Sequence, residues 1–239
     1  PVRVCFLPPP AAERGKKMRL PLTVPGDVLK THEKPSEPYS EKKYTERGTV
    51  MIKSTYEKMK QSGITFDPGM TESEFSEAER IYLFRFPESL REFLSLGIPT
   101  SERDYEFPKW RDFSAENAAY IKQRMQDPFD RLKNDIVKNG FWLPCWGEKP
   151  QSPDEAEAGF SRLISGSPKL IPVFGHRYMP LIDGCVNPPV ISTVGRDTIF
   201  CGAALEDYLE TEFICREYRK INADALPYIP VWTDIIHHT

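Results

Sequence analysis

The hydrophobic pattern of this chain changes its period at Lys169, and that change constrains the fold more than any other feature. Before Lys169, apolar residues recur at spacings of three and four, which is typical of helices that bury one face. After it, short apolar runs alternate with turn residues, which is typical of β-strands. Helices first, an antiparallel sheet second and a closing helix predict an α+β fold.

Local signals indicate where the helices begin and end. Thr71 and Ser152 are each followed three residues later by a glutamate, so each predicts a reciprocal capping box. Ser114 predicts another helix start. Proline pushes the residue before it out of the helical region, so we expect Phe86-Pro87 to end one helix and Asp127-Pro128 to divide another.

Four strands are predicted after the change of period. The first two are Leu170–Phe174 and 178–182. The other two, Val190–Val194 and 198–201, flank Gly195-Arg196-Asp197, and a three-residue loop with a glycine predicts a β-hairpin. A final amphipathic helix from Leu205 to Phe213 follows, and 226–232 is expected to be an extended tail that packs on the body.

The first 50 residues differ in composition from the rest. They carry ten Lys and Arg against six Asp and Glu, a net charge of +4, and show no apolar periodicity. We expect residues 1–50 to be a disordered extension and 51–239 to be one domain whose first helix covers 51–62. A sharper hypothesis is that translation starts at Met51, because the codons for Glu46-Arg47-Gly48 can form a purine-rich ribosome-binding sequence at the right distance.

The segment 140–150 joins the helical part to the sheet part. It holds Trp142 and Trp146 between turn residues, with Gly140 supplying a positive φ at the end of the preceding helix. The two rings could form a stacking platform for a ligand, but a structural joint is the preferred interpretation. One ring is then expected to fill the core, and Trp142→Ala to cost on the order of 3–5 kcal/mol.

Composition restricts the class of function. Residues 51–239 carry 22 Lys and Arg against 29 Asp and Glu, a net charge of −7, which argues against direct nucleic-acid binding and suits a basic protein partner. The five cysteines are widely spaced without zinc-ligand or CxxC spacing, so no metal or cofactor is predicted, and thiols in a cytoplasmic protein are expected. No apolar run is long enough for a membrane span.

Several motifs occur in a characteristic order. They are 85–94 (RFPESLREFL), 140–150, 170–178 (LIPVFGHRY), the predicted hairpin, and 205–209 (LEDYL) ahead of Phe213. In this order they resemble the SUKH superfamily, the Smi/Knr-type domain named for fungal cell-wall-synthesis regulators, over 70–213. The resemblance implies a curved, mainly antiparallel sheet in the C-terminal half, wrapped by N-terminal and C-terminal helices.

The resemblance also implies a function. Members of the superfamily bind proteins without catalysis, and bacterial members often act as immunity proteins that neutralise toxins, many of them nucleases. We therefore predict a non-enzymatic, cytoplasmic protein that occludes a basic toxin or nuclease by stoichiometric binding. A regulatory adaptor unrelated to toxins is one alternative.

Two sets of residues are candidates for partner binding. The last helix carries an acidic run, Glu206, Asp207 and Glu210, which could dock on a basic surface, although such a run is most often a solvated face. Tyr105 and Trp110 lie in a segment of loop character, where exposed aromatic residues could contact a partner, although burial in the core is the commoner outcome.

The other alternative is a small hydrolase centred on His176. With Arg177 and Asp183 or Asp197, this histidine could form an acid–base site, and Cys145, Cys185 or Cys201 could serve as a nucleophile. No spacing fixes a nucleophile, a base and an orienting group together. His176 and Arg177 are therefore interpreted as structural residues that hold a strand turn.

Overall fold

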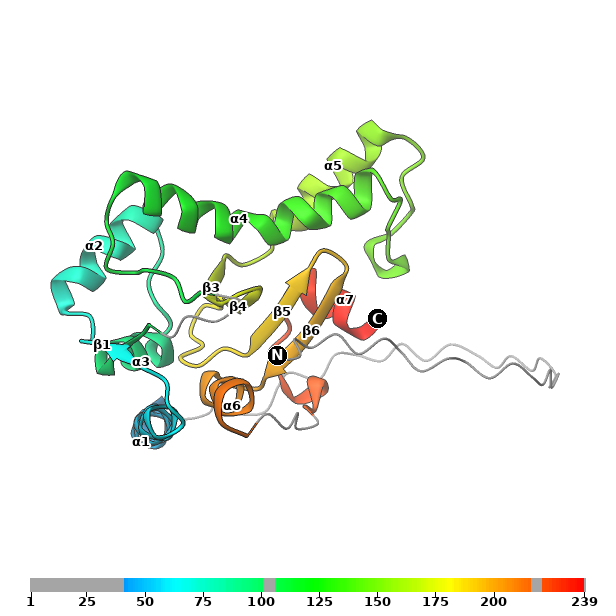
Figure 1. Cartoon of the computed structure of the whole chain (residues 1–239). Coiled ribbons are helices and arrows are strands. Elements are labelled where there is room, and N and C mark those ends of the chain that lie inside the picture. The colour runs from blue at the N-terminus through cyan, green and yellow to red at the C-terminus, as the bar shows by residue number, and fades with distance from the viewer. Residues whose placement is uncertain (1–40, 101–105, 216–220, 239) are drawn as a thin grey trace, which may run out of the picture. The chain divides into compact units, whose positions relative to one another are not determined.

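The computed structural model describes residues 41–100, 106–215 and 221–238, which belong to one compact unit. They form seven α-helices and a four-stranded antiparallel sheet that lies in the C-terminal half and contacts helices (Figure 1), which confirms the α+β fold class. Residues 1–40 of the predicted extension lie outside the described residues.

Three helices form the first part of the unit: α1 (Glu41–Gln61), α2 (Glu72–Tyr82) and α3 (Glu88–Leu96). The predicted start of α1 at Met51 is wrong, because the helix begins ten residues earlier at Glu41. Two short strands, β1 (Phe66–Asp67) and β2 (Ile98–Pro99), pair antiparallel and bring the chain after α1 beside the chain after α3.

Helix α2 begins as predicted but ends earlier. The hydroxyl of Thr71 accepts from the N–H of Glu74, and the Glu74 carboxylate accepts from the N–H of Thr71 at 2.7 Å, so the capping box is confirmed. The helix ends at Leu83, which takes the left-handed conformation (φ 56°, ψ 46°) and donates its N–H to the carbonyl of Glu79. That conformation costs a non-glycine residue roughly 1–2 kcal/mol.

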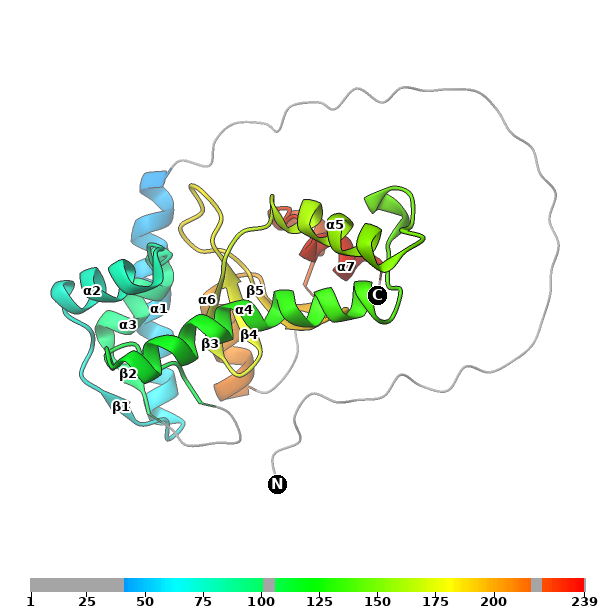
Figure 2. The ribbon, with the colours of Figure 1, turned by 90° about the horizontal axis from the view of Figure 1, so that it is seen from above.

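Helix α4 (Ala115–Val137) is continuous, and the predicted division at Asp127-Pro128 is wrong. Pro128 lies inside the helix and is buried, while Ile121 and Leu132 on either side of it are fully buried in different parts of the core. Packing along the whole length of the helix therefore offsets the hydrogen bond that proline cannot donate. The helix lies across the sheet in both ribbon views (Figure 2) and contacts β3 and β5.

The segment that follows α4 leads into a short 3₁₀ turn, η1 (Pro144–Trp146), and then α5 (Pro153–Ile164). The Ser152 hydroxyl accepts from the N–H of Glu155, as predicted. The Glu155 carboxylate accepts instead from the N–H of Gln151 at 2.7 Å, so the second capping box is displaced by one residue.

The sheet is an antiparallel meander in the order β3-β4-β5-β6, formed by β3 (Leu170–Phe174), β4 (Arg177–Pro180), β5 (Val190–Val194) and β6 (Asp197–Gly202). All four predicted strands are present. The hairpin loop contains only Gly195 and Arg196, one residue fewer than predicted, because Asp197 already pairs with Val194. Gly195 has a φ of 65°, which the tight turn requires.

The predicted closing helix is present as α6 (Leu205–Glu210), continued by a π-helical turn, η2 (Thr211–Cys215). The predicted extended tail is correct only as far as Ile229, because Pro230 and Val231 form a turn in which Val231 has a φ of 74°. Its residues Ile229 and Val231 are buried, as is Trp232, but Trp232 opens another helix, α7 (Trp232–His238), which contacts β6. Within the described residues, no helix combines the length and the apolar character that crossing a bilayer requires.

Candidate functional site

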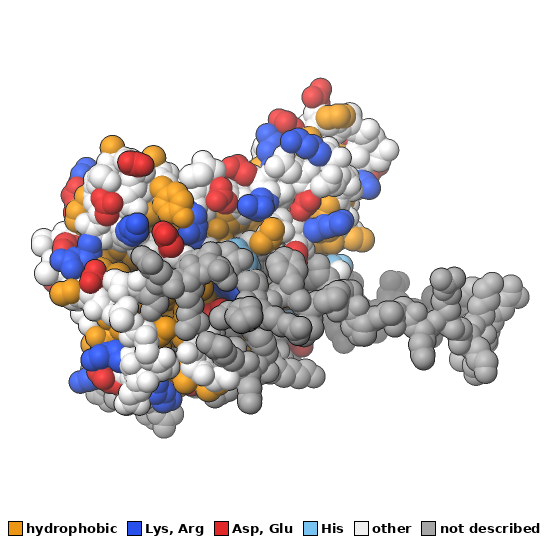
Figure 3. Space-filling model, in the orientation of Figure 1, with side chains coloured by type: hydrophobic (Ala, Val, Ile, Leu, Met, Phe, Trp, Pro, Cys, Tyr) orange, Lys and Arg blue, Asp and Glu red, His pale blue; other side chains and the backbone are white. Residues whose placement is uncertain are grey.

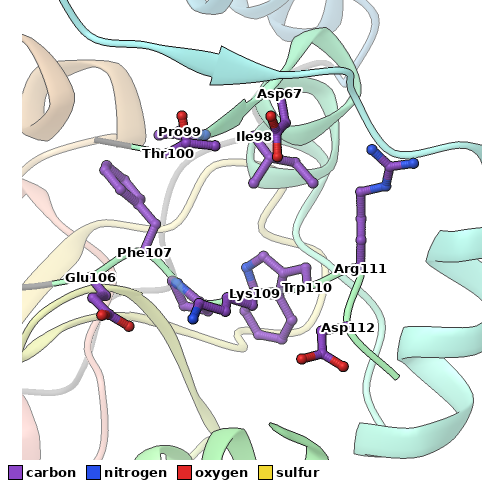
Figure 4. A pocket seen from close by; sticks show the side chains of 11 residues that line it. Asp67, Ile98, Pro99, Thr100, Glu106, Phe107, Lys109, Trp110, Arg111 and Asp112 are labelled. Atoms are coloured by element: carbon purple, nitrogen blue, oxygen red, sulfur yellow. The ribbon is translucent and has the colours of Figure 1, made fainter. Parts of the chain in front are cut away.

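The unit has an open pocket of about 420 Å³ between the β1–β2 pair and the segment 106–112, which we call the Trp110 groove. Its apolar lining comes from Ile98, Pro99, Phe107, Pro108 and Trp110. Figure 4 shows the labelled residues of both segments arranged around a common space. The groove therefore exists only because β1 and β2 pair and place residues from distant parts of the chain together.

Trp110 forms a wall of this groove from within the core. It is 1% exposed, and its ring packs edge-on against Phe86 and Tyr82 at centroid distances of 5.0 and 5.6 Å. The amide of Asn117 on α4 donates to the carbonyls of Lys109 and Asp112 at 3.0 and 2.6 Å, which fixes the backbone on both sides of the tryptophan. The wall is thus rigid and already formed.

The charged residues at the rim leave a surplus of carboxylates. Arg111 donates through Nε to Glu74 at 2.8 Å and through Nη1 to the carbonyl of Pro68, so its charge is compensated from outside the groove. The other charged lining residues are the three carboxylates of Asp67, Glu106 and Asp112 and one further basic residue, Lys109 (Figure 4). A bond from the Ser114 N–H lowers the pKa of Asp112, which keeps this carboxyl ionised.

Tyr105 and Trp110 were the two aromatic residues predicted to contact a partner. Tyr105 lies outside the described residues. Trp110 does not project into solvent as a docking side chain, because its ring is packed among Phe84, Phe86 and Tyr82. The chain from 106 to 112, which includes Trp110, lines the Trp110 groove.

The acidic run on α6 is not a solvated face as a whole. Glu206 is 5% exposed and accepts from the Asn187 amide at 2.8 Å, and burial raises its pKa in spite of this bond. The Asn187 carbonyl oxygen accepts from the N–H of Leu205, so one side chain holds both the carboxylate and the start of α6. The prediction of Glu206 as a docking residue is therefore wrong.

The other two acidic residues of the run are partly buried. Glu210 accepts from Lys58 of α1 at 2.6 Å and from the Thr55 hydroxyl at 3.2 Å. This carboxylate ties α6 to α1 rather than standing free for a partner. Asp207 likewise has an interaction partner.

His176 and Arg177 lie at the turn between β3 and β4. Arg177 is 3% exposed, its Nη1 lies 3.0 and 3.2 Å from the two nitrogens of the His176 ring, and its Nη2 lies 3.5 Å from Glu212. Burial, together with the charges of Arg177, Arg124 and Arg131, lowers the pKa of His176 to about 4. The imidazole is therefore neutral at pH 7, and the Arg124 guanidinium donates to the carbonyl of Gly175 in the same turn.

The proposed acid–base partners of His176 are separated from it by the sheet. The N–H of Thr193 on β5 donates to the carbonyl of His176, so β5 stands between this turn and Asp197 on β6. Asp183 follows the other end of β4. Burial raises the pKa of the Cys145 and Cys185 thiols, which disfavours the thiolate that a nucleophile needs. No group of three or more His, Cys, Asp or Glu among the described residues is arranged to hold a metal.

The segment 140–150 does not join the helical part to the sheet part as predicted, because it connects α4 to α5 and the sheet begins only at Leu170. Leu143 is its deeply buried residue at 7% exposure, whereas Trp142 and Trp146 are half-buried, so neither ring fills the core. The indole rings pack edge-on at 5.6 Å, and Trp146 Nε1 donates to Asp234 of α7 at 2.9 Å. Gly140 has the predicted positive φ, 64°.

The surface over α2, α4 and α5 shows acidic and basic side chains interspersed (Figure 3). No broad field of one sign covers this face, so local grooves must supply any selectivity there. Comparison with protein-family models, curated proteins and solved structures finds no match to this chain.

Proposed function

We propose that this chain is a non-catalytic protein-binding domain whose partner docks in the Trp110 groove. The observation that carries the proposal is an open, preformed apolar groove with a surplus of carboxylates at its rim. Rigid aromatic walls favour binding because little side-chain entropy is lost when a partner enters. The groove takes the place of the acidic run on α6 as the docking surface.

The lining specifies the chemistry of the partner. Ile98, Pro99 and Trp110 fit an apolar side chain, while Asp67 and Glu106 suit a Lys or Arg beside it. The SUKH resemblance supports a particular kind of partner, a basic toxin or nuclease that the chain neutralises in the cytoplasm by occluding it. Surplus negative charge would speed such an encounter.

The test is co-expression with the product of the neighbouring gene, followed by co-purification. Asp67→Lys and Glu106→Lys each reverse a rim charge without touching the apolar wall, and we expect each to lower the association rate on the order of 10-fold at low salt. Glu148→Lys, an exposed glutamate in the loop after η1, is the matched control. Equal binding by all three variants would rule out the groove as the docking surface.

Salt dependence separates a toxin inhibitor from an adaptor. An electrostatically steered inhibitor loses association rate as ionic strength rises, because screening shortens the reach of the rim charges. An adaptor that binds through apolar contacts alone changes little. Protection of cells from an adjacent toxin, lost in Glu106→Lys, would favour the immunity role over the adaptor role.

A further inference from the structure

A second pocket, of about 410 Å³, lies at the end of α2, and we call it the Leu83 groove. It opens between the end of α2, the outer side of α4, the end of α5 and the start of β3. Its apolar lining includes Ile81, Leu83, Met125, Phe129 and Ile164. Nothing in the proposed function uses it.

Leu83 is unusual for a leucine in both its exposure and its backbone conformation. It is 75% exposed, the highest value among the exposed large hydrophobic residues of the described chain, so it contributes little to the core. It also holds a left-handed conformation that glycine or asparagine adopts far more readily at the end of a helix. Neither packing nor backbone geometry therefore favours leucine here, which points to a role outside the unit.

The charges of the groove are of one sign. The ionisable lining residues other than Tyr82 are Lys122 of α4 and Lys169 ahead of β3. The Lys169 ammonium donates to the carbonyl of Leu83 at 2.5 Å, which holds the leucine at the rim and places a positive charge beside it. Lys122 lies on the exposed side of α4. The groove thus combines apolar side chains with two cations, the opposite of the Trp110 groove.

We propose that the Leu83 groove binds an amphipathic helix of a protein partner, with its apolar face on Leu83, Met125 and Phe129 and carboxylates opposite Lys122 and Lys169. An open groove between helix ends suits a helix laid along it, and apolar residues at helical spacing fill such grooves. Met125 adapts its shape to the entering side chains. The proposal does not depend on what occupies the Trp110 groove.

The experiment is selection of peptides from a phage-displayed library of random segments about four helical turns long. Leu83→Gly is used for counter-selection. We expect enrichment of peptides that pair apolar residues at helical spacing with Asp or Glu. The enriched peptide should bind the Leu83→Gly protein at least ~10-fold more weakly than the unchanged protein, because one large apolar contact is lost.

The variants separate binding from folding. Leu83→Gly and Leu83→Asn both relieve the backbone, so each should melt at the same or a higher temperature while losing the peptide. Lys122→Glu should weaken the peptide several-fold at low salt. Tyr120→Ala, an exposed aromatic residue on the same helix outside the groove, should leave binding unchanged.

Three results would overturn the proposal. They are enrichment of basic rather than acidic peptides, absence of any enriched peptide that Leu83→Gly weakens, and equal binding by Lys122→Glu. Sedimentation with phosphatidylserine vesicles tests a different class of occupant. Vesicle binding that depends on Leu83, without peptide binding, would replace the helix by a membrane surface.

Discussion

Tyr82 and Trp110 pack edge to face, with ring centroids 5.6 Å apart and an interplanar angle of 81°, and each ring lines a different groove. Tyr82 belongs to the Leu83 groove and Trp110 to the Trp110 groove, so this pair forms part of a wall that both share. The two rings are 3% and 1% exposed. A rigid shared wall lets two surfaces of opposite charge lie close together on one small unit.

The first prediction concerns the hydroxyl of Tyr82. This group is buried and has no hydrogen-bond partner among the described residues, and burial raises its pKa to about 12. Tyr82→Phe removes a buried hydroxyl that forms no hydrogen bond with the described residues to offset its loss of hydration. We therefore expect the free energy of unfolding, measured in urea, to stay unchanged or to rise by up to ~1 kcal/mol.

Tyr228→Phe is the matched control for that variant. Its hydroxyl donates to Asp234 at 2.8 Å, so this change should lower the free energy of unfolding by roughly 0.5–1 kcal/mol. If Tyr82→Phe proved the more damaging of the two, the Tyr82 hydroxyl would have to be hydrogen-bonded in solution.

Local rules predicted much of the fold because they act over a few residues. The Thr71 capping box, the Ser114 cap and the four strands each follow from side chains close in sequence. The continuity of α4 through Pro128 did not follow, because it depends on burial contributed by distant elements. Tertiary packing there overrides a local signal.

The two grooves were harder to predict from the sequence than the helices and strands. The Trp110 groove depends on the pairing of β1 with β2, strands of two residues each that leave no periodic signal. Its aromatic segment was the one detectable clue. No sign of the Leu83 groove was present in the sequence, because nothing there distinguishes a leucine that takes the left-handed conformation from any other leucine near a helix end. Glu206 was misplaced because a charged residue paired by the distant Asn187 cannot be told from a solvated one.

The second prediction concerns stability against pH at Glu206. Burial raises the pKa of this carboxyl above its usual value, so the native state holds a proton that the unfolded chain has already lost. Stability contributed here is present at low pH and is lost as pH rises through the raised pKa. Glu206→Gln should remove that decline and leave the protein at least as stable at pH 7, measured by urea unfolding across the acidic range.

The control for this variant is Glu148→Gln, an exposed glutamate far along the chain, which should leave the pH profile unchanged. A loss of stability in Glu206→Gln at pH 7 would mean that the ionised carboxylate is favoured in the native state. The pKa of Glu206 would then be lowered in the native state rather than raised.

The third prediction concerns His176, for which the dependence of stability on pH is opposite to that of Glu206. Its pKa is lowered to about 4 from a usual 6.5. Between these two pH values the imidazole is protonated in the unfolded chain but neutral in the native state. Stability is therefore expected to fall as pH drops from about 6.5 to about 4 and to level off below. Ring carbon chemical shifts of His176 measured by NMR should show a midpoint near 4.

Arg131 offers a test of the cause. It is exposed, and its charge contributes to the lowered pKa of His176, so Arg131→Gln should move the NMR midpoint upward without unfolding the protein. Arg162→Gln on α5 is the control and should not move it. A midpoint that does not change in Arg131→Gln would leave burial and the charges of Arg177 and Arg124 as the causes.

The last prediction concerns the contact between Trp142 and Gly159 of α5. A Cβ placed at Gly159 would lie 2.8 Å from Cη2 and 3.1 Å from Cζ3 of the indole ring, so Gly159→Ala must displace the ring. We expect this change to lower the free energy of unfolding by about 1–3 kcal/mol. Trp142→Ala should also cost about 1–3 kcal/mol, less than a fully buried ring would, since Trp142 is half-buried.

The double variant decides whether the indole is the cause. With Trp142 replaced by alanine, the clash is gone, and alanine is the better residue inside a helix by about 1 kcal/mol. Gly159→Ala should then change sign and stabilise the protein, a coupling that urea unfolding of the four proteins measures directly. Gly166→Ala, where a Cβ meets nothing within 4 Å, should show no dependence on Trp142. An equal cost of Gly159→Ala in both backgrounds would mean that α5 and the segment 140–150 do not pack as described.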